Sequence, residues 1–122
     1  MAIAELPSRP IDKGIAGASL LAQILLNKYV DHLPLYRQLR RFRRLGIKIS
    51  MSTMCGWVSQ CARLLLPLYM VLIEKMLESG YIQADETTMR VLDSLKKGAS
   101  HLGYQWIYQN PEAGLVVFEY QI

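Results

Sequence analysis

Along the first two thirds of the chain, apolar residues recur at intervals of three and four, the spacing of one face of an α-helix. This spacing predicts a first helix that has Ser19 as its N-cap and ends before Pro34. A second helix is predicted over residues 35–45, and Gly46 is expected to stop it.

The third predicted helix starts near Ser50 or Ser52. Pro67 is expected to interrupt or kink it, because proline has no backbone N–H. A further helical segment follows over residues 68–77, and Gly80 ends the helical part. The stripe predicted to face the core consists of Met54, Trp57, Val58, Cys61, Leu64 and Leu65.

Beyond Gly80 the pattern changes to short runs rich in β-forming residues. Three strands are predicted, over residues 81–92, 104–109 and 115–121. A polar turn that holds His101 separates the first two strands, and short connections favour an antiparallel meander. The predicted fold class is therefore α+β: an extended linker over residues 1–17, a helical region over 18–80 and a three-stranded sheet over 81–122.

The composition is that of one globular chain, since 52% of its 122 residues are hydrophobic and 20% are charged. The longest apolar run covers residues 64–73, which is ten residues including a proline, so no membrane segment is expected. The N-terminus does not have a basic segment followed by an apolar segment, so no signal peptide is expected either. Cys55 and Cys61 are accordingly expected to be reduced thiols.

Positive charge is concentrated in one part of the chain. Residues 28–63 hold eight lysines and arginines against one acidic residue, whereas residues 64–122 hold four against seven. A basic helix, a glycine turn and a Ser/Thr-rich helix start form a helix-turn-helix-like pattern that predicts contact with DNA phosphates. The alternative is that the arginines form a solvated face and the serines are helix caps. The candidate DNA-binding residues are Arg37, Arg40, Arg41, Arg43, Arg44, Lys48, Ser52 and Thr53.

Two adjacent carboxylates, Asp85 and Glu86, lie in the first predicted strand. Neighbouring side chains on a strand face opposite sides of the sheet, so the pair cannot readily bind one metal ion. A hard cation such as Mg²⁺ needs further oxygen ligands from other segments. The residues alone leave both a metal ligand and an exposed strand charge open for Asp85.

The segments "KYVDHLPLYRQ", "STMCGWVSQCARLLLPL" and "ADETTMRVLD" closely resemble the transposases of the bacterial insertion sequence 66 family. The resemblance implies a DDE-type enzyme with an RNase H-like domain, in which two aspartates and a glutamate hold two Mg²⁺ or Mn²⁺ ions for DNA cleavage and joining. It places the first catalytic aspartate, and thus a metal ligand, at Asp85. Glu86 is given no metal role, because it is expected to point to the other side of the strand. It also implies double-stranded DNA at transposon ends as a partner, a homo-oligomer or other transposase subunits, no membrane, and a cytoplasmic, nucleoid-associated location.

The chain departs from the family pattern at three points. Thr88 stands where the family has proline, the cysteine-rich N-terminal region has no counterpart, and the chain ends before the positions of the second Asp and the Glu. We therefore expect a truncated transposase that is inactive alone, with an unpaired sheet edge that favours marginal stability or self-association. The alternatives are a non-enzymatic DNA-binding or subunit-interaction fragment that competes with full-length transposase, and a decayed gene remnant.

Overall fold

The structure is a computed structural model that describes residues 9–11, 14–78, 80–93 and 98–122. The chain divides into two compact units, here called the helical unit (residues 1–66) and the sheet unit (residues 67–122). Each unit is described by itself. Most of the predicted linker, and residues 94–97 of the predicted turn, lie outside the described residues.

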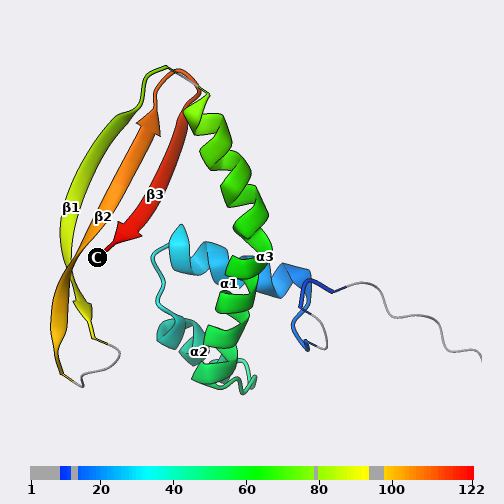
Figure 1. Cartoon of the computed structure of the whole chain (residues 1–122). Helices are drawn as coiled ribbons and strands as arrows, with labels where there is room; N and C mark the ends of the chain where they lie inside the picture. The colour runs from blue at the N-terminus through cyan, green and yellow to red at the C-terminus, as the bar shows by residue number, and fades with distance from the viewer. Residues whose placement is uncertain (1–8, 12–13, 79, 94–97) are drawn as a thin grey trace, which may run out of the picture. The chain divides into compact units, whose positions relative to one another are not determined.

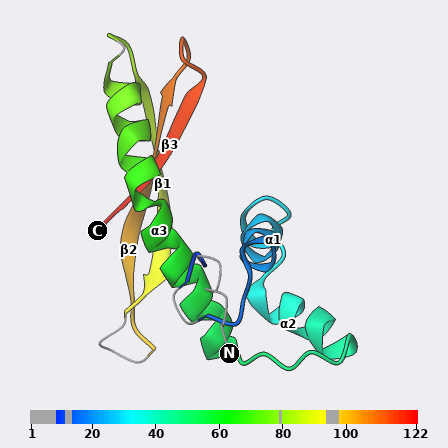
Figure 2. The same cartoon turned by 90° about the vertical axis from the view of Figure 1, so that its right-hand side faces the viewer.

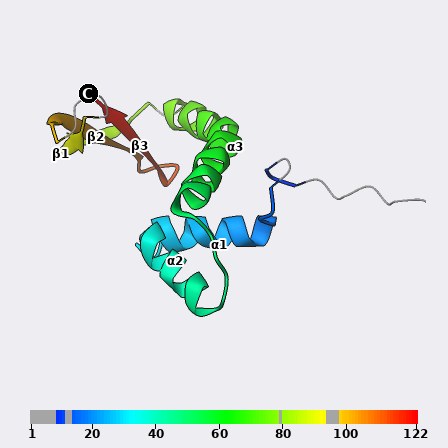
Figure 3. The ribbon, with the colours of Figure 1, turned by 90° about the horizontal axis from the view of Figure 1, so that it is seen from below.

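Three helices supply the helical unit: α1 (Ala18–Tyr29), α2 (Leu35–Arg44) and the first part of α3 (Met51–Leu77) (Figure 1 and Figure 3). α1 starts two residues earlier than predicted, because its N-cap is Gly17 in an extended conformation and Ser19 lies inside the first turn. The three helices meet in one apolar core, as the 3.6-residue period predicts. Its buried members are Ile11, Ala16, Leu21, Ile24, Met54, Trp57 and Cys61.

A buried amide joins α2 to the rest of the helical unit. Gln38 is the one fully buried residue of this arginine-rich helix. Its Nε2 donates hydrogen bonds to the carbonyl oxygens of Ile24 in α1, at 3.2 Å, and of Leu33 in the connecting loop, at 3.0 Å. A buried hydrogen bond of this kind contributes about 1 kcal/mol. The Oε1 of the same amide is buried and has no hydrogen-bond partner among the described residues, which offsets part of this gain.

The connection from α2 to α3 follows the predicted chemistry. Gly46 follows the end of α2 with φ = +81°, a left-handed conformation that glycine adopts without steric cost. Ser50 then caps α3, since its Oγ accepts a hydrogen bond from the backbone N–H of Thr53 at 3.0 Å.

The predicted interruption at Pro67 is wrong, because α3 runs unbroken from Met51 to Leu77. The alternative, a kink at Pro67, stays a prediction. Proline removes one backbone hydrogen bond and costs roughly 3 kcal/mol in a helix interior, which a 27-residue helix rich in leucine and methionine accommodates. This continuity also makes α3 long and apolar enough, by length and composition, to cross a membrane. The expectation of no membrane segment was based on the ten-residue apolar run at residues 64–73, which is shorter than the whole helix. Length and apolar composition are weak evidence for a membrane span, because core helices of soluble proteins can have both.

The predicted core stripe of α3 is correct only in its first half. Met54, Trp57 and Cys61 are buried, whereas Leu64 and Leu65 are 55% and 46% exposed. Exposed leucines continue along the helix at Leu66 and Leu68. The apolar residues around the middle of α3 therefore cover more of the helix circumference than the described residues bury.

The sheet unit contains β1 (Gln83–Leu92), β2 (Ser100–Asn110) and β3 (Leu115–Gln121). The strands form one antiparallel sheet in the order β1-β2-β3, with β2 in the middle (Figure 1 and Figure 2). The predicted α+β class and the meander are confirmed. β2 begins four residues earlier than predicted, because residues 100–103 pair with the end of β1 rather than forming part of the turn.

The core of the helical unit gives a direct test of this packing. Met54→Ala should lower the free energy of unfolding by about 2–5 kcal/mol, because the side chain is fully buried and its removal leaves a cavity. Met51→Ala, on the same helix but with Met51 43% exposed, should change it by less than about 0.5 kcal/mol. Urea unfolding followed by helical circular dichroism measures both. Equal effects of the two substitutions would contradict the described core.

Candidate functional site

The five arginines of α2 and Lys48 form a cationic surface on the helical unit. All six side chains are exposed. Arg41, Arg43 and Arg44 occupy the last turn of α2, where positive charge interacts favourably with the helix dipole. No ion pair joins any of the six to an acidic side chain within the described ranges. The surface is therefore a concentration of uncompensated positive charge, which suits a polyanion. Its members are Arg37, Arg40, Arg41, Arg43, Arg44 and Lys48.

The polar groups at the start of α3 form hydrogen bonds with one another. The Oγ of Ser50 lies 2.8 Å from the Oγ of Ser52 and 2.7 Å from the Oγ1 of Thr53, in addition to accepting the Thr53 N–H. These hydroxyls and one of the free N–H groups are thus engaged by the cap. The arrangement supports the interpretation that the serines cap the helix. It gives less support to the interpretation that the start of α3 is free to bind phosphate.

Asp85 lies on β1, in a cross-strand row with Ile107 and Phe118. Its side chain is exposed, and its Oδ1 accepts a hydrogen bond of 2.9 Å from the backbone N–H of Glu86. Glu86 belongs to the next row, opposite Trp106 and Glu119, and so faces the other side of the sheet. The two carboxylates are therefore separated by the sheet, as the strand period predicts.

The carboxylates do not converge on a metal site. Among the residues that the structure describes, no three His, Cys, Asp or Glu side chains lie close enough together to hold a metal ion. A two-metal site needs several carboxylates around both ions, and Asp85 is one exposed carboxylate on one strand. The described residues therefore do not fit a Mg²⁺ or Mn²⁺ pair, and Asp85 as a metal ligand stays a prediction.

The sheet face that carries Asp85 is apolar along β3. Phe118 and Tyr120 point to this face and are 58% and 42% exposed. The ring of Tyr120 lies across Gly103, where an added Cβ would come within 2.5 Å of the ring carbon Cε2. Its hydroxyl lies 3.0 Å from Nε2 of His101, which the structure places in β2 and not in a loop. The sequence pattern did not reveal this arrangement, since it depends on strand register.

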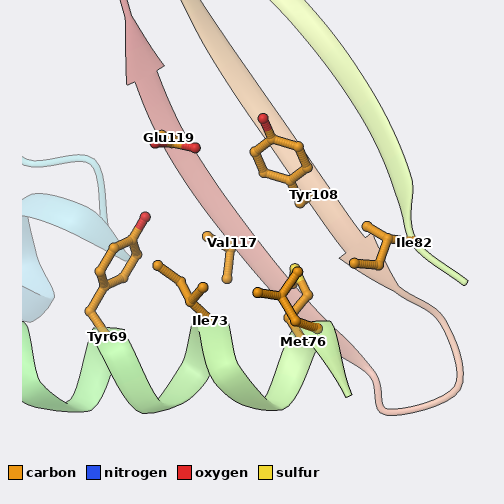
Figure 4. A pocket seen from close by; sticks show the side chains of 8 residues that line it. Tyr69, Ile73, Met76, Ile82, Tyr108, Val117 and Glu119 are labelled. Carbon is orange, nitrogen blue, oxygen red and sulfur yellow. The ribbon is translucent and has the colours of Figure 1, made fainter. Parts of the chain in front are cut away.

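The opposite face of the sheet meets the C-terminal part of α3 around a cavity of about 160 Å³ (Figure 4). Tyr69, Ile73 and Met76 reach it from α3, and Tyr108, Val117 and Glu119 reach it from the strands. The Tyr69 hydroxyl donates a 3.0 Å hydrogen bond to the carbonyl oxygen of Phe118. Val117 is buried here, so this is the side of the sheet that α3 covers.

Neither cysteine is bonded to the other, as expected. Cys55 is exposed, and Cys61 is buried in the core of the helical unit. Burial raises the pKa of the Cys61 thiol, which keeps it protonated and unreactive at neutral pH.

Comparison with known proteins identifies relatives along most of the chain. Residues 13–122 match the family model described as "Transposase IS66 family". An uncharacterized protein, y4qI, of Sinorhizobium fredii (strain NBRC 101917 / NGR234) is 34% identical over 102 residues, which are 84% of this chain and 18% of the relative. A second uncharacterized protein of that strain, y4jD, is 36% identical over 91 residues, 75% of this chain and 18% of the relative. No solved structure matches the chain significantly.

The Tyr120 ring over Gly103 can be tested with a double-mutant cycle. Gly103→Ala should destabilise the β2–β3 pair by about 1 kcal/mol, because the ring must move and give up its hydrogen bond with His101. In a Tyr120→Ala background the same substitution should cost nothing measurable, since the obstructing ring is gone. Amide hydrogen exchange of β2 and β3 reports the opening free energy. An equal cost in both backgrounds would exclude the ring as the cause.

Proposed function

The chain belongs to the IS66 transposase family, and we propose that it contributes DNA-backbone contacts to transposition through the cationic surface of α2. The observation that carries this proposal is the density of charge: five exposed arginines on a ten-residue helix without an ion pair to the described residues. Guanidinium groups pair well with phosphate oxygens, and backbone neutralisation supplies most of the affinity of non-specific DNA binding. Double-stranded DNA is therefore the partner best suited to this surface.

The local fold agrees with a helix-turn-helix-like role for α2 and α3. The turn between them contains the left-handed Gly46, and Lys48 extends the positive charge beyond the helix. We assign the main phosphate contacts to α2, because the Ser50 cap already engages Ser52 and Thr53. Those two hydroxyls would add only weaker contacts beside the arginines.

For the sheet unit we propose the start of an RNase H-like domain, with Asp85 as one carboxylate of a DDE triad. The support is its position on the first strand of an antiparallel meander, in the segment that resembles the family motif. Because the described residues hold no cluster of ligands, we propose that this chain binds DNA without cutting it. The chain spans 18% of the length of the relatives y4qI and y4jD, so strand transfer is not proposed for this chain by itself.

The same observations support a non-enzymatic role as a second candidate. A chain that binds DNA through α2, and whose described residues hold no complete metal site, could occupy transposon ends or subunit contacts in competition with a full-length transposase. Both candidate functions require DNA binding. In the first the chain contributes to transposition, and in the second it competes with a full-length transposase. Addition of this chain to a transposition assay of a full-length relative separates them, since only the competitor lowers the yield.

Binding through the cationic surface should be strongly dependent on salt. The affinity for a duplex should fall steeply between about 50 and 200 mM salt, because bound phosphates release counterions. Arg40→Ala/Arg44→Ala should weaken binding by about ten- to hundredfold and reduce the slope of log affinity against log salt by about two. The matched control, Lys75→Ala/Arg90→Ala, removes two exposed cations from the sheet unit and should change neither quantity. Fluorescence anisotropy measures the affinities. If both double substitutions lower the affinity equally, the arginines of α2 are only a solvated face and do not bind DNA specifically through this surface.

The chain alone should neither cleave nor join DNA in Mg²⁺ or Mn²⁺. One exposed aspartate cannot hold two ions at useful occupancy, so the wild type and Asp85→Ala should give the same background with labelled transposon-end DNA. Gel analysis of strand cleavage measures this. Metal-dependent cleavage that Asp85→Ala abolishes would refute the proposal.

A further inference from the structure

Four of the α2 arginines surround one hollow of the helical unit. Its volume is about 400 Å³, and Leu33 completes its lining. No acidic side chain among the described residues forms an ion pair with these arginines, so their mutual repulsion is uncompensated there. Planar guanidinium groups around a hollow are suited to a phosphate, which they can bind through paired hydrogen bonds. The arginines are Arg37, Arg40, Arg41 and Arg44.

An aromatic ring lies beside this hollow. Tyr36 is 46% exposed at the start of α2. The guanidinium carbons of Arg37 and Arg40 are both 5.9 Å from the centre of its ring, and Arg37 Nε donates a 3.2 Å hydrogen bond to its hydroxyl. Two arginines are thus shared between the hollow and the ring, which places a phosphate-binding feature next to an aromatic surface.

We infer that Tyr36 and the arginine hollow together bind an unpaired nucleotide of a DNA strand, with the phosphate in the hollow and the base stacked on the ring. Stacking on an aromatic side chain requires an exposed base face, which a paired strand keeps inside the duplex. Arginines beside the ring add further stacking and cation–π attraction. This inference rests on the proposed contact between α2 and DNA, and it extends that contact from duplex backbone to unpaired segments.

The test compares two single strands with the same backbone charge at one salt concentration. One is a fluorescently labelled thymidine strand, the other carries abasic residues in place of the thymidines, and a duplex of equal length is the third probe. The wild type should bind the thymidine strand more tightly than the abasic strand by about five- to hundredfold for each stacked base. Fluorescence anisotropy gives the three affinities.

Substitutions at Tyr36 assign the preference to its ring. Tyr36→Leu should remove the preference for the thymidine strand while leaving affinity for the abasic strand and the duplex within about twofold, since the arginines remain. Tyr36→Phe should keep the preference, because the ring is retained. The matched control is Tyr29→Leu: Tyr29 is 60% exposed on α1 beside Lys28, outside the hollow, and its loss should leave all three affinities unchanged.

The possible failures are distinguishable. If the wild type binds both single strands equally, or if Tyr36→Leu weakens both equally, the stacking inference is wrong. If, at the same time, duplex binding keeps its dependence on salt and on Arg40 and Arg44, the proposed function stands without it. If no probe binds, the inference and the proposed function fail together.

Discussion

The buried side-chain amide of Gln38 is the polar link between α2 and the rest of the helical unit. Half of the residues in α2 are arginines, and Leu35, Leu39 and Phe42 reach the core only in part. A helix with so little apolar surface gains limited stability from burial alone. The Gln38 amide supplies specific attachment, because it bonds at once to α1 and to the loop before α2. Together with the packing of Leu35, Leu39 and Phe42 against the core, this attachment orients α2, and all five of its arginines are exposed.

In the sheet unit, the corresponding constraint is the two-residue period of the strands. Val117 and Tyr108 face α3, so their neighbours Phe118 and Ile107 face away from it, and the register places Asp85 in the same outward row. That row combines a carboxylate with apolar side chains. Any segment that covered it would remove Asp85 from water, and a buried carboxylate is tolerated only beside a cation or hydrogen-bond donors. The same residue is an ordinary exposed charge when the face is open, and it needs a cation or hydrogen-bond donors beside it when the face is covered.

Local patterns in the sequence predicted what depends on local chemistry. The glycine at 46 and the serine cap of α3 are decided by neighbouring residues, and the short connections favour the antiparallel meander; the structure has all three. One local prediction failed, since the N-cap of α1 is Gly17 and not Ser19. The other failures lie where longer-range effects decide. Pro67 is tolerated because the helix continues on both sides of it, and the early start of β2 requires the pairing of residues 100–103 with β1. The arginine hollow was also missed, since a charge count locates the arginines but does not show which of them line one space.

The two chemistries proposed for the family differ in how much chain they require. Phosphate contacts can be collected along one helix, since each arginine acts on a separate oxygen and the contributions add approximately. A two-metal centre requires carboxylates from several segments to lie within a few ångströms of one another. It therefore cannot form from one local segment and requires the tertiary structure that brings those segments together. A segment that spans 18% of its longer relatives can therefore hold a complete cationic surface and yet only one acidic residue at the expected position of the metal site. Asp85 lies exposed on β1, and the described residues hold no group of three metal-binding side chains, so its role as a metal ligand stays a prediction.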